Sequence, residues 1–353
     1  MDLSALLQLA GGKKASDIHL TNNSSPILRI DGVLVPVNSP PLTREALKQL
    51  IYQALTEQQI KKFEAERELD FSLATRGFDR FRVNVHMQRG AIEAALRRIS
   101  STIPTMESLN LPPVVADLTR RPNGLVLVTG PTGSGKTTTQ AAMIDLINAE
   151  SAKMIICIED PIEYVHVNKR SVVKQREVYR DTSSFAEALK RCFRQDPDVI
   201  VIGEMRDLET ISAALTAAET GHLVIATLHT PDAPQTIDRI IDVFPPHQQP
   251  QVRLQLACAL QGIISQHLLP RVSGNGRILA AEILIVTTGV RNLIRERQTE
   301  QIRSAMQTGV ALGMKTLDKA LKELCEKGLI SEEVARSRIP VPEEFKASVG
   351  LRR

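Results

Sequence analysis

Residues 130–137 read Gly-Pro-Thr-Gly-Ser-Gly-Lys-Thr, and this stretch decides the fold. It has the G-x-x-x-x-G-K-T spacing of a phosphate-binding loop, in which glycines let the backbone curl until its N–H groups face phosphate oxygens. An apolar run over residues 124–129 precedes the loop, and a helical pattern begins near Lys136. A strand, a loop and a helix N-terminus in this order predict a nucleotide site, because the helix end adds partial positive charge.

The loop residues have distinct expected roles. Lys136 is expected to bridge the β- and γ-phosphates of ATP, and the Thr137 hydroxyl is expected to ligate Mg²⁺. ATP and Mg²⁺ are therefore the predicted cofactors. The predicted nucleotide-binding residues are Gly130, Thr132, Gly133, Ser134, Gly135, Lys136, Thr137 and Thr138.

The chain after residue 114 has the pattern of an α/β nucleotide-binding core. Apolar runs at 154–158, 199–202 and 223–227 alternate with helical segments. Such runs are apolar on both faces, as parallel strands covered by helices must be. We predict this core over residues 114–270.

Beyond about Gln248 strands become scarce in the pattern, and helical periodicity predominates. We therefore predict a mostly helical C-terminal extension over residues 271–353. The periodic segments are Val252–Leu269, Val290–Arg297, Gln301–Met306, Leu317–Glu326 and Glu332–Arg338.

Residues 1–100 have the pattern of a small α+β domain. Apolar residues alternate with the period of strands through much of this region. Thr43–Glu68 instead has the pattern of two helices, with Thr43 and Thr56 as caps. Segment 101–113 contains three prolines and is predicted to be a linker. The predicted strands are Ser16–Leu20, Pro26–Val37, Leu69–Ala74 and Arg80–Val85.

Acidic residues follow two of the apolar runs in the predicted core. Glu159, Asp160 and Glu163 follow the first run, and Glu204 follows the second. In a parallel sheet the carboxyl ends of the strands line the ligand crevice, so both clusters are expected to face the phosphates. Hydrolysis needs a group that orients water and charge placed at the γ-phosphate, and these carboxylates are the candidates.

Two histidines, His222 and His229, flank the third apolar run. Histidine serves both as a structural hydrogen-bonding residue and as a chemical group. Position alone leaves both roles equally open.

The composition excludes some function classes. Hydrophobic residues make up 42% of the chain and charged residues 24%, which argues against wholesale disorder. The net charge of +4 is too small to indicate nucleic acid as a partner, and 3% aromatic residues without tryptophan leave few stacking platforms for single strands. The four cysteines form no close pair, so we expect buried thiols in a reducing compartment rather than a zinc site.

The N-terminus lacks the basic start and the long apolar stretch of a signal peptide. No apolar run approaches the ~20 residues that a membrane-spanning helix needs. We therefore expect a cytoplasmic protein.

The order of the motifs resembles that of the secretion ATPase superfamily. After the phosphate loop, residues 158–163, 203–207 and 220–230 match the stretches called the Asp box, Walker B and the His box in that family. The resemblance covers nearly the whole chain, from Ser16 to Ile330. It implies a RecA-like ATPase domain with a PAS-like N-terminal domain, assembled as a homohexameric ring with ATP near the subunit boundaries.

The resemblance also implies roles for single residues. Glu163 resembles the general base for water, Glu204 the Walker B acid that acts on Mg²⁺ through water, and His229 the sensor of the γ-phosphate. The family supplies arginines from the N-terminal domain to the nucleotide, and Arg82 and Arg97 match that region. By pattern alone, an arginine in this strand is equally compatible with a polar sheet face.

Residues 289–296 match six of the eight positions of Ala-Ile-Arg-Asn-Leu-Ile-Arg-Glu, a motif that marks the pilus-retraction branch of the superfamily. The departures are Gly289 and Val290, at a helix start where glycine is tolerated, so we expect the amphipathic helix to form. This branch implies an ATPase that drives type IV pilus retraction and twitching motility. It implies association with the inner membrane, a platform protein there and a paralogous retraction ATPase as partners.

Other functions stay open at this point. Pilus-extension and type II secretion ATPases typically carry an extra N-terminal domain and a four-cysteine zinc motif, which this sequence lacks. An accessory retraction ATPase shares the size and the motifs, and only the match at residues 291–296 favours the principal retraction type. A RecA-type DNA translocase or helicase and a nucleotide-binding scaffold without turnover are further alternatives.

Overall fold

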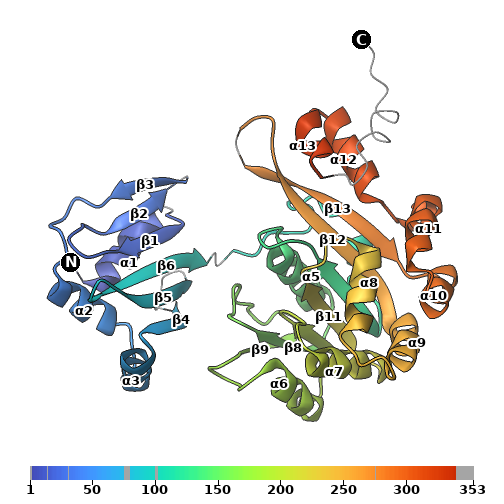
Figure 1. Ribbon diagram of the computed structural model, residues 1–353, viewed down its shortest axis with the longest axis horizontal. Coiled ribbons are helices and arrows are strands. Elements are labelled where there is room, and N and C mark those ends of the chain that lie inside the picture. Colours follow the sequence, from blue (N-terminus) through green and yellow to red (C-terminus); the bar gives the residue numbers. More distant parts are fainter. Residues whose placement is uncertain are drawn as a thin grey trace. The chain divides into compact units, whose positions relative to one another are not determined.

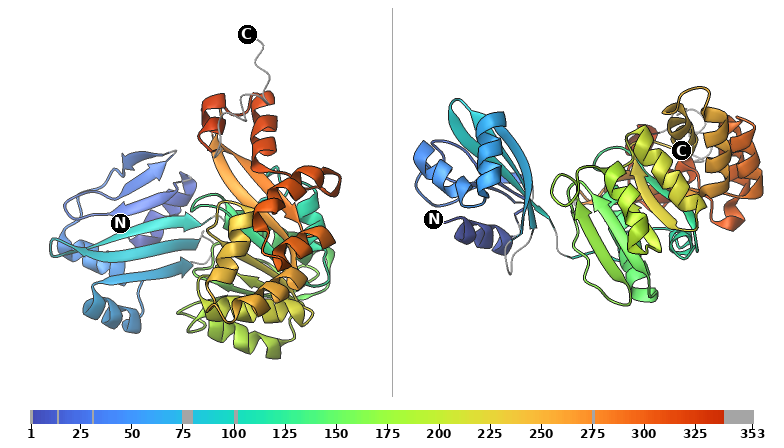
Figure 2. Two further views of the ribbon diagram at one scale, coloured as in Figure 1. Left: turned by 45° about the vertical axis from the view of Figure 1, so that its right-hand side comes forward. Right: turned by 90° about the horizontal axis from the view of Figure 1, so that it is seen from below.

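The structure is a computed structural model that describes residues 2–13, 15–30, 32–74, 80–99, 102–274 and 276–338 (Figures 1 and 2). It divides into two compact units. The N-terminal unit comprises Met1–Thr102 and Pro161–Val165, and the C-terminal unit comprises Ile103–Asp160 and His166–Arg353. Ser100, Ser101 at the start of the predicted linker, and residues 339–353 of the predicted extension lie outside the described residues.

The N-terminal unit is an antiparallel sheet with helices packed against one face. The strand order is β3-β2-β1-β6-β5-β4. The strands are β1 (Asp17–Leu20), β2 (Ile27–Ile30), β3 (Val33–Pro36), β4 (Glu68–Ala74), β5 (Arg80–Gln88) and β6 (Ala91–Ile99). The helices are α1 (Leu3–Gly12), α2 (Arg44–Tyr52) and α3 (Glu57–Glu66).

Alternation along the strands explains this sheet. Phe81 and Val83 in β5 are buried against the helices, whereas Arg82 between them is exposed. Thr43 and Thr56 cap α2 and α3 as predicted, each accepting a backbone N–H from the first turn. Helix α1 was not predicted, because this short stretch ends in two glycines, which lower helix propensity. Its leucines nevertheless pack into the core of the unit.

The C-terminal unit is built on a mostly parallel sheet. The strand order is β13-β12-β7-β11-β10-β8-β9, in which only β13 pairs antiparallel with its neighbour among the described strands. The strands are β7 (Gly124–Thr129), β8 (Met154–Glu159), β9 (Val172–Glu177), β10 (Val199–Ile202), β11 (Leu223–Leu228), β12 (Leu260–Pro270) and β13 (Arg277–Ile285).

Helices cover this sheet and continue after its last strand (Figure 1). They are α4 (Val114–Thr119), α5 (Lys136–Glu150), α6 (Phe185–Cys192), α7 (Leu208–Glu219), α8 (Ala233–Asp242), α9 (Gln249–Ala259), α10 (Thr288–Arg295), α11 (Ile302–Thr308), α12 (Leu317–Glu326) and α13 (Glu332–Arg336). Single 3-10 turns are η1 (Phe193–Gln195), η2 (Thr299–Gln301) and η3 (Val310–Leu312). Every residue of β7, β10 and β11 is buried, which is why these strands are apolar on both faces. The predicted α/β fold class, with its small α+β N-terminal part and C-terminal helices, is confirmed.

The prediction of a helix over Val252–Leu269 and of few strands beyond Gln248 was wrong. Helix α9 ends at Ala259, and the next residues form β12, which pairs with β7. Nearly all of β12 is buried on both faces, and an apolar run of that kind has no period that separates strand from helix. Strand β13 then adds to the same sheet and carries the C-terminal helices α12 and α13 on an apolar cluster (Figure 1). Among the described residues, no helix has the length and apolar character needed to cross a membrane.

Glu282 is the one core carboxylate of β13, and it is 7% exposed. Its Oε1 accepts the backbone N–H of Ala233 at 2.9 Å. Burial raises the pKa of Glu282 to about 7, against the smaller opposing effect of that hydrogen bond. The folded protein therefore holds a proton on Glu282 over a pH range where the unfolded chain does not.

Replacing Glu282 with glutamine tests this difference. In the unfolded chain the carboxyl titrates near its ordinary pKa of 4.5, so between 4.5 and about 7 the folded state binds more protons. The free energy of unfolding of the wild type must then fall as pH rises through this window. Glutamine does not titrate in this window. The free energy of unfolding of the variant, minus that of the wild type, should therefore increase by about 3 kcal/mol from the lower to the upper end of the window. Urea denaturation of both proteins over this range measures the gain, and a difference that does not change with pH would contradict it.

Candidate nucleotide site

The phosphate loop lies between β7 and α5, as the sequence predicts. Gly130 has φ 137° and Gly135 has φ 90°, a region that residues with a Cβ rarely adopt. A Cβ at Gly130 would also collide with the backbone carbonyl of Gln266 in β12. The loop can therefore close against β12 only because a glycine stands at this position.

The N-terminus of α5 is open toward the loop. Gly135 precedes the helix and has no side chain that could cap it, so the partial positive charge of this helix N-terminus faces the loop, where a phosphate can bind. Thr137 and Thr138 in that turn are half-buried, and Ser134 is buried. Thr132 and Gly133, on the outer side of the loop, are exposed.

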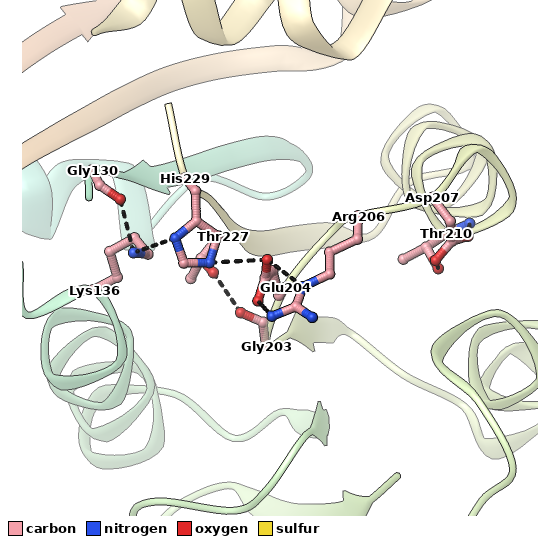
Figure 3. A network of polar contacts seen from close by, with 9 residues as sticks. All are labelled: Gly130, Lys136, Gly203, Glu204, Arg206, Asp207, Thr210, Thr227 and His229. Carbon is pink, nitrogen blue, oxygen red and sulfur yellow. Dashed lines mark hydrogen bonds and ion pairs between the residues drawn. The ribbon is translucent and has the colours of Figure 1, made fainter. Parts of the chain in front are cut away.

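The Lys136 ammonium lies inside the curl of the loop (Figure 3). Lys136 is 8% exposed, and its Nζ donates to the carbonyls of Gly130 at 2.8 Å and Pro131 at 3.1 Å. Nζ also lies 3.4 Å from Nδ1 of His229. An ammonium can only donate, so a hydrogen bond between these two groups requires Nδ1 as the acceptor.

The other side of His229 meets a carboxylate. His229 Nε2 is 2.9 Å from Oε1 of Glu204, and Arg206 contacts both carboxylate oxygens of Glu204, at 2.6 and 2.8 Å. Burial alone would raise the pKa of Glu204, but the hydrogen bonds from Arg206 and His229 outweigh it and lower the pKa below the ordinary value. Glu204 is therefore an ionised carboxylate that ends a chain of contacts starting at Lys136 (Figure 3).

Adjacent parallel strands bring these groups together. Lys136, His229 and Glu204 follow β7, β11 and β10, which are neighbours in the sheet, so their carboxyl ends share one edge. The Thr227 hydroxyl donates to the Gly203 carbonyl and so ties the end of β11 to the segment that carries Glu204 (Figure 3).

Three further predicted site residues belong to the N-terminal unit. Glu163 belongs to the 161–165 segment, which groups with the N-terminal unit, and its role stays a prediction. Arg82 and Arg97 are opposite each other on β5 and β6, so they share one exposed face of the N-terminal sheet. Arg97 Nε donates to Asp17 Oδ1 at 2.9 Å, while its side chain is 73% exposed. His222 lies at the amino end of β11, away from the phosphate loop.

The histidine at the amino end of β11 has structural contacts. His222 Nδ1 is 3.0 Å from the carbonyl of Ala217, and its ring meets that of Phe193 edge-on with centroids 5.6 Å apart. Of the two histidines that the sequence left undecided, the structure therefore places only His229 among the groups around Lys136.

Sequence reasoning missed three side chains around the loop. Gln140, one helical turn after Lys136, donates to the carbonyls of Ile202 and Ile225 and so fastens α5 to β10 and β11. Arg277 Nη1 approaches the Gly133 carbonyl at 3.4 Å. The third is Arg206, and it alone of the three had a signal in the sequence, because it lies two residues after Glu204.

A buried lysine inside a glycine loop, an open helix N-terminus and an ionised carboxylate at the neighbouring strand end together define a P-loop ATPase. The sequence shows which kind of P-loop ATPase this is. Residues 2–336 match the family described as "Type II/IV secretion system protein", and the chain belongs to that family.

Individual relatives match over nearly the whole chain. The type IV pilus retraction ATPase PilT of Pseudomonas aeruginosa is 50% identical over 345 residues, which are 98% of this chain and 100% of the relative. The type IV pilus ATPase PilU of the same organism is 39% identical over 351 residues, which are 99% and 92% of the two chains. A crystal structure of the pilus retraction motor PilT with bound ADP superposes with a TM-score of 0.93 at 50% identity, covering 98% of this chain and 99% of that one.

Glu204 offers a direct test of the site. The variant Glu204→Gln keeps the shape of the side chain but removes the negative charge that Arg206 and His229 contact. We expect ATP turnover to fall roughly 10²–10³-fold, as on loss of a preorganised charged group at a reacting phosphate. ADP affinity should change little, because the loop and Lys136 are unaltered.

The measurements are steady-state ATPase activity and titration with a fluorescent ADP analogue. The control is Glu187→Gln in α6, which alters a glutamate that also pairs with a cation, Lys190 at 3.1 Å, but on the surface. Turnover of Glu204→Gln equal to that of the control would remove Glu204 from the reaction.

Proposed function

We propose that this chain is the ATPase motor that retracts type IV pili and thereby powers twitching motility. The observation that carries the proposal is the 50% identity to PilT over 98% of the chain, against 39% to PilU. The alternative of an accessory, PilU-type retraction ATPase has the weaker support. The net charge of only +4 gives no support to the alternative of a RecA-type DNA translocase, and no nucleic acid partner is proposed.

In this proposal the phosphate loop and Lys136 hold the β- and γ-phosphates of ATP. Mg²⁺ bound there would neutralise phosphate charge. Mg²⁺ is usually held by few protein oxygens together with water and phosphates, which fits the half-buried Thr137 hydroxyl and Glu204 acting through water. His229 senses the γ-phosphate, because a phosphate that draws Lys136 toward itself changes the 3.4 Å contact with Nδ1.

The hydrolysis step needs a base and added positive charge. Glu163 is proposed as the general base for the attacking water. Arg82 and Arg97 are proposed to reach the nucleotide from the N-terminal unit, which their shared exposed face permits. The assembly that brings these parts together is a homohexamer with ATP near the subunit boundaries.

The motor is proposed to work in the cytoplasm, peripherally attached to the inner membrane at the pilus base. There it engages the platform protein, and a paralogous retraction ATPase is a further proposed partner. Helix α10, which holds the retraction motif, is the proposed contact element. Its Val290 and Ile294 are buried, so the predicted amphipathic helix forms despite Gly289.

Helices α9 and α10 hold each other through two arginines. Arg291 of α10 donates to the carbonyl of Cys258 at the end of α9, at 2.9 Å, and Arg253 of α9 donates to the carbonyl of Ile294 near the end of α10, at 3.4 Å. Carbonyls in a last helical turn lack the regular partner four residues further on, and each arginine donates to one such carbonyl. The motif therefore has an inward part that fixes the helix and an exposed part that includes Asn292 and Glu296.

Substitutions separate the two parts of α10. The double variant Asn292→Ala/Glu296→Ala should keep ATPase activity within about twofold of the wild type and yet abolish pilus retraction in a strain that lacks its own retraction ATPase. Arg291→Ala should instead lower the free energy of unfolding by about 1 kcal/mol, through loss of a helix-terminal hydrogen bond. Full retraction by the double variant would rule out the exposed face of α10 as the contact.

The proposed chemistry and assembly can be tested together. Steady-state ATPase activity is measured for the wild type and for Glu163→Gln, with mass from light scattering in the same samples, with and without Mg-ATP. We expect a hexamer in both proteins and a fall in turnover of roughly 10²–10⁴-fold in the variant, the usual contribution of a general base. Persistent turnover in the variant would leave Glu204 as the better candidate, and a wild-type monomer would contradict the ring.

A further inference from the structure

Two helices begin at the same buried carboxylate. Glu282 Oε1 accepts the N–H of Ala233, the first residue of α8, at 2.9 Å, and Oε2 lies 3.4 Å from the N–H of Leu317, the first residue of α12. Helix N-termini carry unpaired N–H groups, and each of these two helices directs one of them at a carboxyl oxygen of Glu282. Glu282 thus joins β13 to two helices that are far apart in the sequence.

The first of these helices follows directly from the site. Residues 229–232 connect His229 to α8, and a second side chain of the β12–β13 hairpin fixes this connection, because His267 Nε2 is 3.2 Å from the Pro231 carbonyl. Glu282 is paired with Ser265, two residues before His267 in β12, so Glu282 and His267 lie on the same face of the hairpin. The hairpin therefore contacts this part of the chain at two points, the Pro231 carbonyl and the Ala233 N–H.

The face of the β12–β13 hairpin that carries Glu282 and His267 also contacts the strand that precedes the phosphate loop. Ser265 is opposite Glu282 in β13 on one side and opposite Thr129 in β7 on the other. The hydroxyls of Ser265 and Thr129 are 2.8 Å apart and fully buried, and Thr129 is the last residue before the loop. A row of polar side chains across three strands thus links the support of the His229 segment to the base of the phosphate loop.

On its other side Glu282 contacts the C-terminal helices. The neighbouring residue Ile283 exchanges both backbone hydrogen bonds with Lys315, at 2.7 and 3.0 Å, and Thr316 then caps α12. The start of α12 is therefore fixed on β13 beside the carboxylate. Asp232 and Arg303 are the charged groups whose fields act on Glu282.

We propose that Glu282 is a positioning residue for ATP hydrolysis, which holds the His229 segment in place beside Lys136 and links it to the start of α12. The inference rests on the proposed role of His229 as the sensor of the γ-phosphate. Glu282 touches no reacting atom. It acts through Ala233 and the short connection to His229, so its loss displaces the sensor without removing the phosphate loop.

The experiment compares full-length Glu282→Ala, Glu282→Gln and a matched control, Glu93→Ala. Glu93 is also a buried glutamate that accepts a backbone N–H, that of Asn22 at 3.1 Å, but it lies in β6 of the N-terminal unit. We expect kcat of Glu282→Ala to fall about tenfold, with KM for ATP and affinity for a fluorescent ADP analogue within about twofold of the wild type. Glutamine keeps an acceptor oxygen for Ala233, so Glu282→Gln should restore kcat to within about threefold.

A merely structural role predicts other results. Thermal melting reports the folded fraction, and kcat is expressed per folded protein. Equal losses of kcat in Glu282→Ala and Glu93→Ala, or no recovery in Glu282→Gln, would overturn the inference. So would a Glu282→Ala variant with unchanged kcat.

The variants His229→Ala and His229→Ala/Glu282→Ala separate this inference from the function on which it rests. If both groups act through one segment, the double variant loses no more than His229→Ala alone, whereas independent effects multiply. Unchanged turnover in His229→Ala would remove the sensor role and the inference with it. A loss in His229→Ala combined with an independent, multiplying loss from Glu282→Ala would keep the sensor and overturn the positioning role.

Discussion

The site depends on one constraint: three neighbouring parallel strands must end together at one edge of the sheet. β7, β11 and β10 pair in register, and each is followed at once by a functional segment. This register brings Lys136, His229 and Glu204 into one chain of contacts, although no local turn joins them. A slip of one residue in either strand pair would turn the strand's side chains to the opposite face and separate these groups. The fully buried strands make such a slip costly, because it would have to repack the core on both sides of the sheet.

Much of this fold was predictable because its strands differ in character. The central strands are uninterrupted apolar runs, whereas β5 in the N-terminal unit alternates, so the two sheets are distinguishable in sequence. The same reasoning failed at β12, which is as apolar as a buried helix. The strand conformation of β12 depends on its pairing with the edge of β7. It also depends on the close approach at Gly262, where a Cβ would lie 2.9 Å from the Leu118 side chain. Neither is a property of the local sequence.

The site was predictable to the extent that chemistry is encoded by spacing. The glycines and Lys136 form a motif of fixed length, and Glu204 follows a strand, so their meeting follows from topology. Supports such as Gln140 and Glu282 have no such signal. Glu282 and Ala233 are 49 residues apart, and their contact exists only because β13 returns beside the start of α8. In the sequence, a glutamate inside an apolar strand looks like an interruption of the apolar run. Its partners leave no signal, because they are two backbone N–H groups that nearly any residue can supply.

The pairing of β12 with β7 has a consequence for synthesis on the ribosome. Ser265, which contacts Thr129, emerges 136 residues after it. Non-local pairs form late and domains complete as units, so the nascent chain carries a finished N-terminal unit long before its second sheet closes. Until then β7 presents an unpaired edge of an apolar sheet, a surface to which chaperones and other strands bind. The nucleotide site can therefore be completed only after β12 has been synthesised, and a chain truncated before β12 would leave this apolar edge of β7 uncovered.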